Sequence, residues 1–376
     1  TDSIRLWEGG FRANRSGSHS IGYSWPMTDL DWREQSDPAR CLQALAAHRL
    51  LPVAGLLAER GLLRRDLVAP AEQMARRHVE TMRQGGVLEA HVLEVLSKKE
   101  IPVLMLKGAL LARTVYPTPE SRLRVDLDIL VPEAQFRLAK TTLLSTGLRQ
   151  VHEEHSGLPI TQEAFACNLD GTCHGVDLHW DLTHRSVLKG RLPFDGLWRR
   201  RTRLESLPPR IFGLSAPDAL LHACGHYFAH FRGQFRPDQW LLDMDLLWRA
   251  MDAGEREEVM ERASTTGVAG LVAGGLEQAR DRFATKIDVE ALDQLKERGR
   301  NAAASRLLTN PRFSFSEVLQ NMRDEPRWRD GVRLFFRTFF PRIAYMRYKY
   351  DTYPALALPW LYVKRLSEGV RKSGRN

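Results

Sequence analysis

The chain has few cysteines, and they are scattered. Its 376 residues contain four, at Cys41, Cys167, Cys173 and Cys224, with no close pair at the spacing of a metal finger. Reduced thiols are the default for such a pattern in a cytosolic protein. A disulfide framework is therefore not expected.

Long apolar runs are also lacking. No run approaches the roughly 18 apolar residues that a membrane helix needs, and the first residues show no charged region followed by the apolar core of a secretory signal. There is no internal repeat and no low-complexity tract. We expect a soluble, cytoplasmic protein without a transmembrane segment.

What the chain does have is an ordinary globular composition with a basic excess. It is 43% hydrophobic and 27% charged, which excludes disordered and fibrous classes, and its formal net charge is +9. An excess of positive charge attracts polyanions such as nucleotides, nucleic acid or an anionic membrane surface, and does not choose among them.

Shifts in pattern along the chain predict five regions. They are a poorly ordered arm at 1–37, N-terminal helices at 38–100, a core with strands at 101–184, a basic linker at 185–215 and a helical region at 216–376. The N-terminal helices are expected to break near Pro52 and Pro70, because proline ends or begins helices.

Two carboxylates stand on an apolar segment at 125–131. In a strand, Asp126 and Asp128 point to the same side, about 7 Å apart, while Leu127 and Ile129 pack on the other face. Two like charges held together cost free energy unless a cation lies between them, and hard divalent ions such as Mg²⁺ take carboxylate oxygens. The segment predicts a metal site.

A hairpin is predicted from the segments 165–169 and 175–182 with the turn signal Asp170-Gly171 between them, and its second strand is acidic. In the segment 175–182, Asp177 and His179 share one face, and Val176 and Leu178 share the other. If this strand lies beside the first, Asp177 completes a cluster of three carboxylates.

The segment before the first acidic strand has a phosphate-binding pattern. An apolar strand at 103–106 ends in Lys107 and Gly108, and a helix follows to Tyr116. Glycine lets the backbone approach an anion, and a helix N-terminus presents free N–H groups to it. Taken alone, such a pair is more often an ordinary turn.

Together these motifs, in this order, resemble the family of uncharacterised bacterial nucleotidyltransferases within the DNA polymerase beta-like nucleotidyltransferase superfamily. The resemblance covers roughly residues 40 to 365. It rests on Leu106-Lys107-Gly108, Tyr116-Pro117, Arg122, Asp126-x-Asp128-Ile129-Leu130-Val131, Val176-Asp177-Leu178-His179-Trp180, Ala47-His48, His222-x3-His226 and Trp240-Leu241-Leu242-Asp243. One departure is that the broader superfamily has Gly-Ser or Gly-Gly at the phosphate turn, whereas Lys107 and Ala109 flank Gly108 here.

The resemblance implies an α+β fold with a small mixed sheet flanked by helices from both ends of the chain. It also implies Asp126, Asp128 and Asp177 as metal ligands and catalytic acids. With two Mg²⁺ ions expected, the predicted reaction moves a nucleoside monophosphate from an NTP such as ATP to an acceptor and releases pyrophosphate. A hydroxyl on a small molecule or peptide is the favoured acceptor; an RNA end is less favoured, because the basic residues lack interleaved stacking aromatics.

Phosphate contacts are predicted for Lys107, Gly108, Arg122 and Arg124, and His179 is a candidate contact for the nucleotide or an orienting residue. For Lys107, pairing with an aspartate is the open alternative. For the two arginines, ion pairs with Asp126 or Glu120 are an equal alternative. A satisfied structural histidine is the alternative for His179.

Three other patterns favour a structural interpretation. His222, His226 and His230 share one face of a predicted helix, and packing on the helix of Asp243 is preferred over a zinc site because no fourth ligand is evident. The basic residues at 199–203 are expected to form an exposed turn, and the aromatic-basic tail to form core helices rather than a membrane-surface helix.

Two other functions compete with nucleotidyl transfer. A kinase-like transfer of the γ-phosphoryl group would use the same acids, and a regulatory nucleotide-binding module would keep the fold without turnover. The presence of all three acids argues against the second.

Overall fold

A computed structural model of the chain describes residues 30–151 and 161–309, except 170, 184, 186, 206 and 230–234, together with 332, 336, 340, 343, 346, 359–364 and 367. Most of the predicted arm at 1–37, His230 and most of the aromatic-basic tail lie outside the described residues.

The N-terminal part forms the predicted helices. They are α1 (Pro38–Ala47), the short 3-10 helix η1 (Leu51–Val53), α2 (Ala54–Glu59), η2 (Arg65–Leu67) and the long α3 (Val68–Lys98). Asp37 caps α1 by accepting a hydrogen bond from the backbone N–H of Ala39. As predicted, the α-helices break near Pro52, which lies in η1 between α1 and α2. Pro70 lies in the first turn of α3, where a missing N–H costs little.

A mixed six-stranded sheet occupies the centre of the molecule. Its strands are β1 (Val103–Met105), β2 (Asp126–Leu130), β3 (Arg149–Gln150), β4 (Gln162–Leu169), β5 (Thr172–His179) and β6 (Ile211–Gly213), in the order β3-β4-β5-β2-β1-β6. The β4–β5 hairpin is antiparallel, as predicted, and Gly171 in its turn has a φ of 80°. The central pair, β2 and β5, is parallel.

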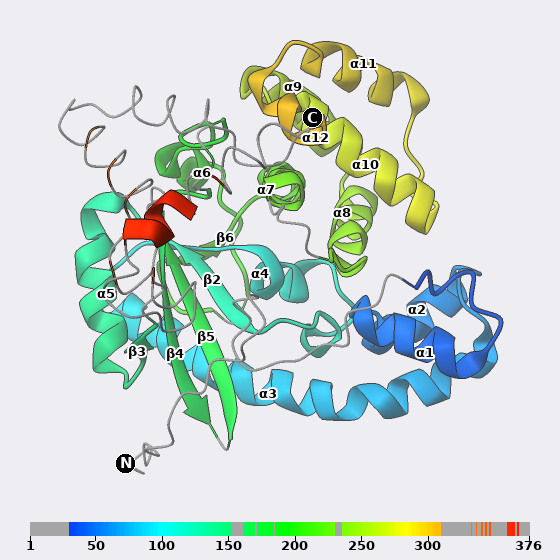
Figure 1. The fold of residues 1–376 in the computed structure, drawn as a ribbon, viewed down its shortest axis with the longest axis horizontal. Helices are drawn as coiled ribbons and strands as arrows, with labels where there is room; N and C mark the ends of the chain where they lie inside the picture. Colours follow the sequence, from blue (N-terminus) through cyan, green and yellow to red (C-terminus); the bar gives the residue numbers. More distant parts are fainter. Residues whose placement is uncertain are drawn as a thin grey trace.

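Helices from the core region border this sheet. They are α4 (Lys107–Thr114), η3 (Pro119–Ser121), η4 (Glu133–Gln135) and α5 (Phe136–Ser145). Both α3 and α5 contact β5, whereas α4 contacts β2. Figure 1 shows α3 running beneath the sheet, with α1 and α2 beyond one end of it.

The predicted basic linker contains more structure than expected. It forms α6 (Phe194–Arg199) and then β6, which adds a parallel edge strand to β1. Arg201 stacks over the rings of Trp198 and Phe212, at 4.4 Å from each centroid. This segment is thus attached to the sheet over part of its length.

The helices from α7 to α12 gather at one side of the sheet in Figure 1. They are α7 (Ala216–Ala229), α8 (Gln239–Ala250), α9 (Ala253–Thr265), α10 (Ala269–Phe283), α11 (Val289–Gly299), η5 (Ala303–Ser305) and α12 (Arg306–Thr309). Of these, α7 contacts α4 and so brings the helical region up to the sheet.

One connected set of buried apolar side chains runs from Trp32 through the sheet to Leu307. The α+β class and the mixed sheet are therefore confirmed. The division of the chain into separate domains stays a prediction.

Within the described part of the chain, no single helix has the length and apolar character needed to cross a bilayer. Only α1 taken together with the segment Leu51–Glu59 passes that test, and the two are bent by 110° from each other.

Candidate active site

The parallel pairing of β2 with β5 brings the two acidic strands together. Asp128 lies directly opposite Asp177, and Asp126 lies opposite Gly175. Paired residues of neighbouring strands point to the same face, so the acids collect on one side of the sheet, while Leu127, Ile129 and the apolar residues of β5 are buried on the other.

Lys107 lies at the turn between β1 and α4, with its ammonium group against this acidic face. Its Nζ atom is 2.5 Å from Oδ1 of Asp128. Its backbone has a φ of 43°, a left-handed conformation that a residue with a side chain adopts at a cost of about 1 kcal/mol. Burial opposes the charge of Lys107, but Asp128 and the two other aspartates outweigh burial and raise its pKa.

His179 approaches Asp128 from the end of β5. Its Nε2 atom is 3.0 Å from the same carboxylate oxygen, and its ring is almost wholly buried. Burial would raise the pKa of Asp128, but Lys107 and then the hydrogen bond with His179 hold that pKa well below its usual range. Asp128 is thus a carboxylate at neutral pH, held between two nitrogen groups.

Asp126 is in a different electrostatic state. Burial, followed by repulsion from Asp128, raises the pKa of its carboxyl group to about 6. Lys107, Arg49 and Arg122 act in the opposite direction and do not cancel the rise. The half-buried Asp126 therefore exchanges a proton close to physiological pH.

Among the described residues, one group has ligand atoms placed for a metal ion. It comprises Asp128, Asp177 and His179, whose ligand atoms all lie within 4.8 Å of one another. Asp126, which the sequence places among the ligands, is outside this group, and His179 stands in it instead. The Asp177 carboxylate is held from β4 by Gln162, whose Nε2 donates to it at 3.1 Å.

Arg122 and Arg124 are both placed in buried ion pairs. Arg122 donates through Nε and Nη2 to the two oxygens of Asp243, at 2.7 Å each. Arg124 donates through Nε to Glu89 of α3 at 2.6 Å. Ion pairs were one of the two predicted alternatives, but the partners are not Asp126 or Glu120. With both arginines only about 5% exposed, their predicted phosphate contacts would require these pairs to open.

Gly108 lies beneath the two arginines. A Cβ atom at this position would come within 3.2 Å of Cβ of Arg124 and 3.6 Å of Nη1 of Arg122. The glycine therefore allows the start of α4 to lie against the segment that leads into β2. Its predicted contact with phosphate remains a prediction.

His222 is packed close to the site on α7. Burial, then the charges of Lys107 and His179, lower the pKa of His222 to about 3. The ring of His226, one turn later, makes an edge contact with Trp240 of α8 at 4.9 Å. This contact packs His226 against α8, the helix that carries Asp243, as the packing interpretation expects.

Sequence reasoning missed two residues at the site, Arg49 and Gln162. Arg49 lies about 80 positions before Asp126 in the chain, within electrostatic reach of it. No spacing rule links such distant residues. Gln162 was detectable only if the register of the hairpin was already known.

Comparison with known proteins agrees with this arrangement. A family model described as "Uncharacterised nucleotidyltransferase" matches residues 34–284, more than half of the chain. No protein with a curated description matches the sequence. The chain belongs to this nucleotidyltransferase family, and the protein is a transferase of that class.

Proposed function

We propose that the protein transfers a nucleoside monophosphate from an NTP to a hydroxyl or similar group on a small molecule or peptide, with release of pyrophosphate. The observation that carries the proposal is the parallel register of β2 and β5, which sets Asp128 beside Asp177 on the face that Lys107 borders. Membership of the nucleotidyltransferase family supports the same reaction class.

The donor set fits a divalent metal ion. Carboxylate oxygens of Asp128 and Asp177 are hard ligands, and the ammonium group of Lys107 already binds to Asp128 on this face of the sheet. In the proposal Asp128 and Asp177 hold Mg²⁺, with Asp126 as a further ligand once it loses its proton. When bound, the metal supplies charge stabilisation at the reacting phosphate and lowers the pKa of the acceptor oxygen.

The chain's own groups bind and orient around that centre. The ammonium of Lys107 binds a phosphate oxygen, and the buried start of α4 at Gly108 presents backbone N–H groups to the same anion. His179 fixes the rotamer of Asp128 through its hydrogen bond. Asp177 lies nearest the acceptor in this proposal and assists removal of its proton.

The proposal is tested with NTPs labelled at the α- or the γ-phosphate. The protein is incubated with Mg²⁺, each of the four NTPs in turn and a mixture of small-molecule and peptide acceptors, and products are separated by mass. Transfer of the α-label with a gain of a whole nucleotide is the expected result.

Two other results contradict the proposal in different ways. Transfer of the γ-label alone, with a gain of one phosphate, means a kinase. Tight NTP binding without release of pyrophosphate means a regulatory module.

A further inference from the structure

Arg49 occupies a position that helices usually give to glycine. At the end of α1, the N–H of Arg49 donates to the carbonyl of Ala46 at 3.0 Å, and the N–H of Leu50 donates to that of Leu45 at 2.8 Å. This pair of bonds is a Schellman cap, whose second residue past the helix adopts a left-handed conformation. Arg49 has a φ of 61° there, so a side chain is kept at a conformational cost.

The conformation alone does not mark a site, because α3 ends in the same way at Glu100, with a φ of 55°. Glu100 is paired with Arg210, which also has a positive φ, and both side chains are at least half exposed. Arg49 differs from them in its surroundings, because it is half-buried and interacts electrostatically with Asp126 and Asp243.

The guanidinium of Arg49 lies within electrostatic reach of Asp126. Burial and then repulsion by Arg122 lower the pKa of Arg49 to about 10, while Asp126 and Asp243 act in the opposite direction. The influence is mutual, since Arg49 is one of the cations that lower the pKa of Asp126. Arg49 is therefore a positively charged group close enough to Asp126 for the two charges to influence each other.

A single glutamine fastens the turn at Arg49 to the segment that leads into β2. The side chain of Gln239 donates to the carbonyl oxygen of Arg49 at 3.3 Å and accepts from Nη1 of Arg122 at 2.7 Å. The backbone N–H of Gln239 also donates to the carbonyl of His48 at 3.3 Å. Arg122 is itself held by Asp243, so the turn and the acidic strand share one support.

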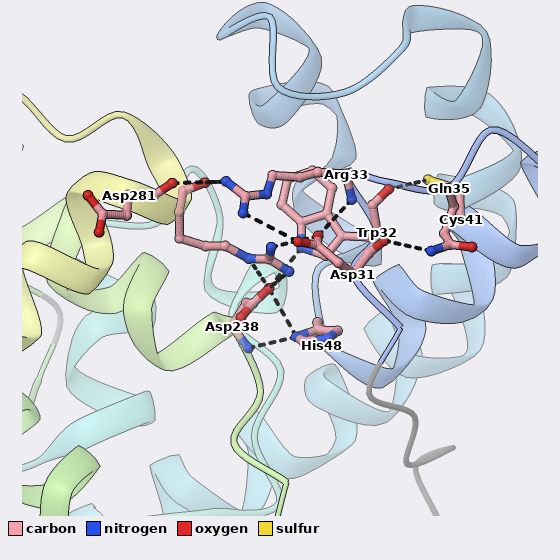
Figure 2. Close-up of polar contacts among 9 residues, drawn as sticks. Asp31, Trp32, Arg33, Gln35, Cys41, His48, Asp238 and Asp281 are labelled. Carbon is pink, nitrogen blue, oxygen red and sulfur yellow. Dashed lines mark hydrogen bonds and ion pairs between the residues drawn. The ribbon is translucent and has the colours of Figure 1, made fainter. Parts of the chain in front are cut away.

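A buried network around Asp238 fixes the same turn from the other side. Figure 2 shows His48 beside Asp238, below the ring of Trp32. Nδ1 of His48 is 3.0 Å from the Asp238 carboxylate, and Nε1 of Trp32 donates to that carboxylate at 2.9 Å. Arg282 of α10 pairs with it as well. These buried contacts hold His48, and with it the backbone of the neighbouring Arg49, in a fixed position against α8 and α10.

We propose that Arg49 binds the triphosphate of the nucleotide beside Asp126. The inference rests on the proposed nucleotidyl transfer and adds a phosphate-binding residue to it. A triphosphate carries more negative charge than Lys107 can neutralise, and the planar guanidinium can donate to two phosphate oxygens at once. The buried Arg122 and Arg124 are committed to Asp243 and Glu89.

The test uses Arg49→Asn and inorganic tripolyphosphate with Mg²⁺, a probe that carries no base. Asparagine tolerates the left-handed conformation, so the cap is kept while the charge is removed. Titration calorimetry should show an affinity about ten- to a hundredfold weaker than that of the wild type, as for loss of a charged hydrogen-bonding pair. Arg210→Asn is the matched control and should bind as the wild type does.

Arg49→Gly is the second variant, because glycine is the preferred residue at this cap and the fold should be retained. Its affinity should fall as far as that of Arg49→Asn, with an unchanged unfolding temperature. Wild-type affinity in both variants overturns the role of Arg49 while leaving nucleotidyl transfer in place. A wild-type protein that binds neither tripolyphosphate nor any NTP overturns the proposed function itself, and the inference with it.

Discussion

At the residue scale, the proposed role of Asp126 as a metal ligand predicts that metal binding depends on pH, because burial and Asp128 raise the pKa of its carboxyl group to about 6. A ligand must lose its proton before it can hold a cation, so protons and metal compete. The affinity for Mn²⁺, used as a spectroscopic probe, should fall by about tenfold for each pH unit below 6. Electron paramagnetic resonance at pH 5 to 8 measures the free Mn²⁺.

Asp126→Asn is the control for this pH dependence, because the amide has no proton to lose and should give a nearly flat profile over the same range. A wild-type profile that is equally flat contradicts the assignment.

The raised pKa of Asp126 also affects the stability of the fold, with a defined sign. The native state loses stability as the pH rises from 3.8, the usual pKa of an aspartate, through about 6. Over that interval the unfolded chain has already lost this proton, whereas the folded protein still keeps it.

At the residue scale, the sequence was sufficient for the acids but not for their partners. Because side chains alternate along a strand, the sequence alone places Asp126 and Asp128 on one face of their strand, and Asp177 on the polar face of its own. The partners of Arg122 and Arg124 lie 121 and 35 residues away. Such pairs depend on how helices pack against the sheet, which local patterns do not encode.

At the scale of elements, Asp243 on α8 anchors the segment that leads into β2. Its carboxylate accepts from Arg122 and from the hydroxyl of Tyr116 at 2.7 Å, and it is 4% exposed. Asp243→Asn leaves the buried guanidinium without a counter-charge, which should cost about 3–5 kcal/mol of unfolding free energy in urea.

The matched control for Asp243→Asn is Asp281→Asn. The side chain of Asp281 is exposed and pairs only with its neighbour Arg280 among the described ion pairs. Its loss should change the unfolding free energy by no more than about 0.5 kcal/mol. If the two variants have equal stability, Asp243 does not anchor β2.

The packing of α10 against α11 depends on two facing glycines. A Cβ atom at Gly299 would collide with the backbone of Gly270. Backbone atoms cannot move aside as a flexible side chain does, so Gly299→Ala should destabilise the fold by about 1–3 kcal/mol. Gly86 in α3 has nothing within 4 Å of an added Cβ. Gly86→Ala should therefore stabilise the fold by about 0.5–1 kcal/mol. Thermal unfolding that moves in the same direction for both variants contradicts this account.

The longer elements were predictable from the sequence, and the shorter ones were not. The hairpin has eight residues in each strand and a glycine in its turn, so the sequence indicates it, although the predicted strands at 165–169 and 175–182 differ from the observed bounds. The edge strand β6 has only three residues within a basic segment. Three residues are too few for a period to be recognised, and pairing with β1 decides their conformation.

At the scale of the whole molecule, the candidate site draws on regions far apart in the chain. The core with strands contributes Lys107 and the acids of β2 and β5, and the turn after α1 contributes Arg49. From α8, Gln239 bonds to Arg49 and Arg122, and Asp243 pairs with Arg122. The C-terminal helices therefore support the site directly. The family match also extends past the sheet to residue 284, so it includes α8.

The central claim is that Asp177 and Asp128 together hold the metal for nucleotidyl transfer, and one comparison tests it most directly. Pyrophosphate release from each NTP with Mg²⁺ is measured for the wild type, for Asp177→Asn and for Asp181→Asn. The Asp181 carboxylate accepts hydrogen bonds from the backbone N–H groups of Thr183 and Gly190 in the turn after β5. The account predicts release by the wild type and by Asp181→Asn, and a rate at least about a hundredfold lower for Asp177→Asn. Equal release by Asp177→Asn and the wild type contradicts it.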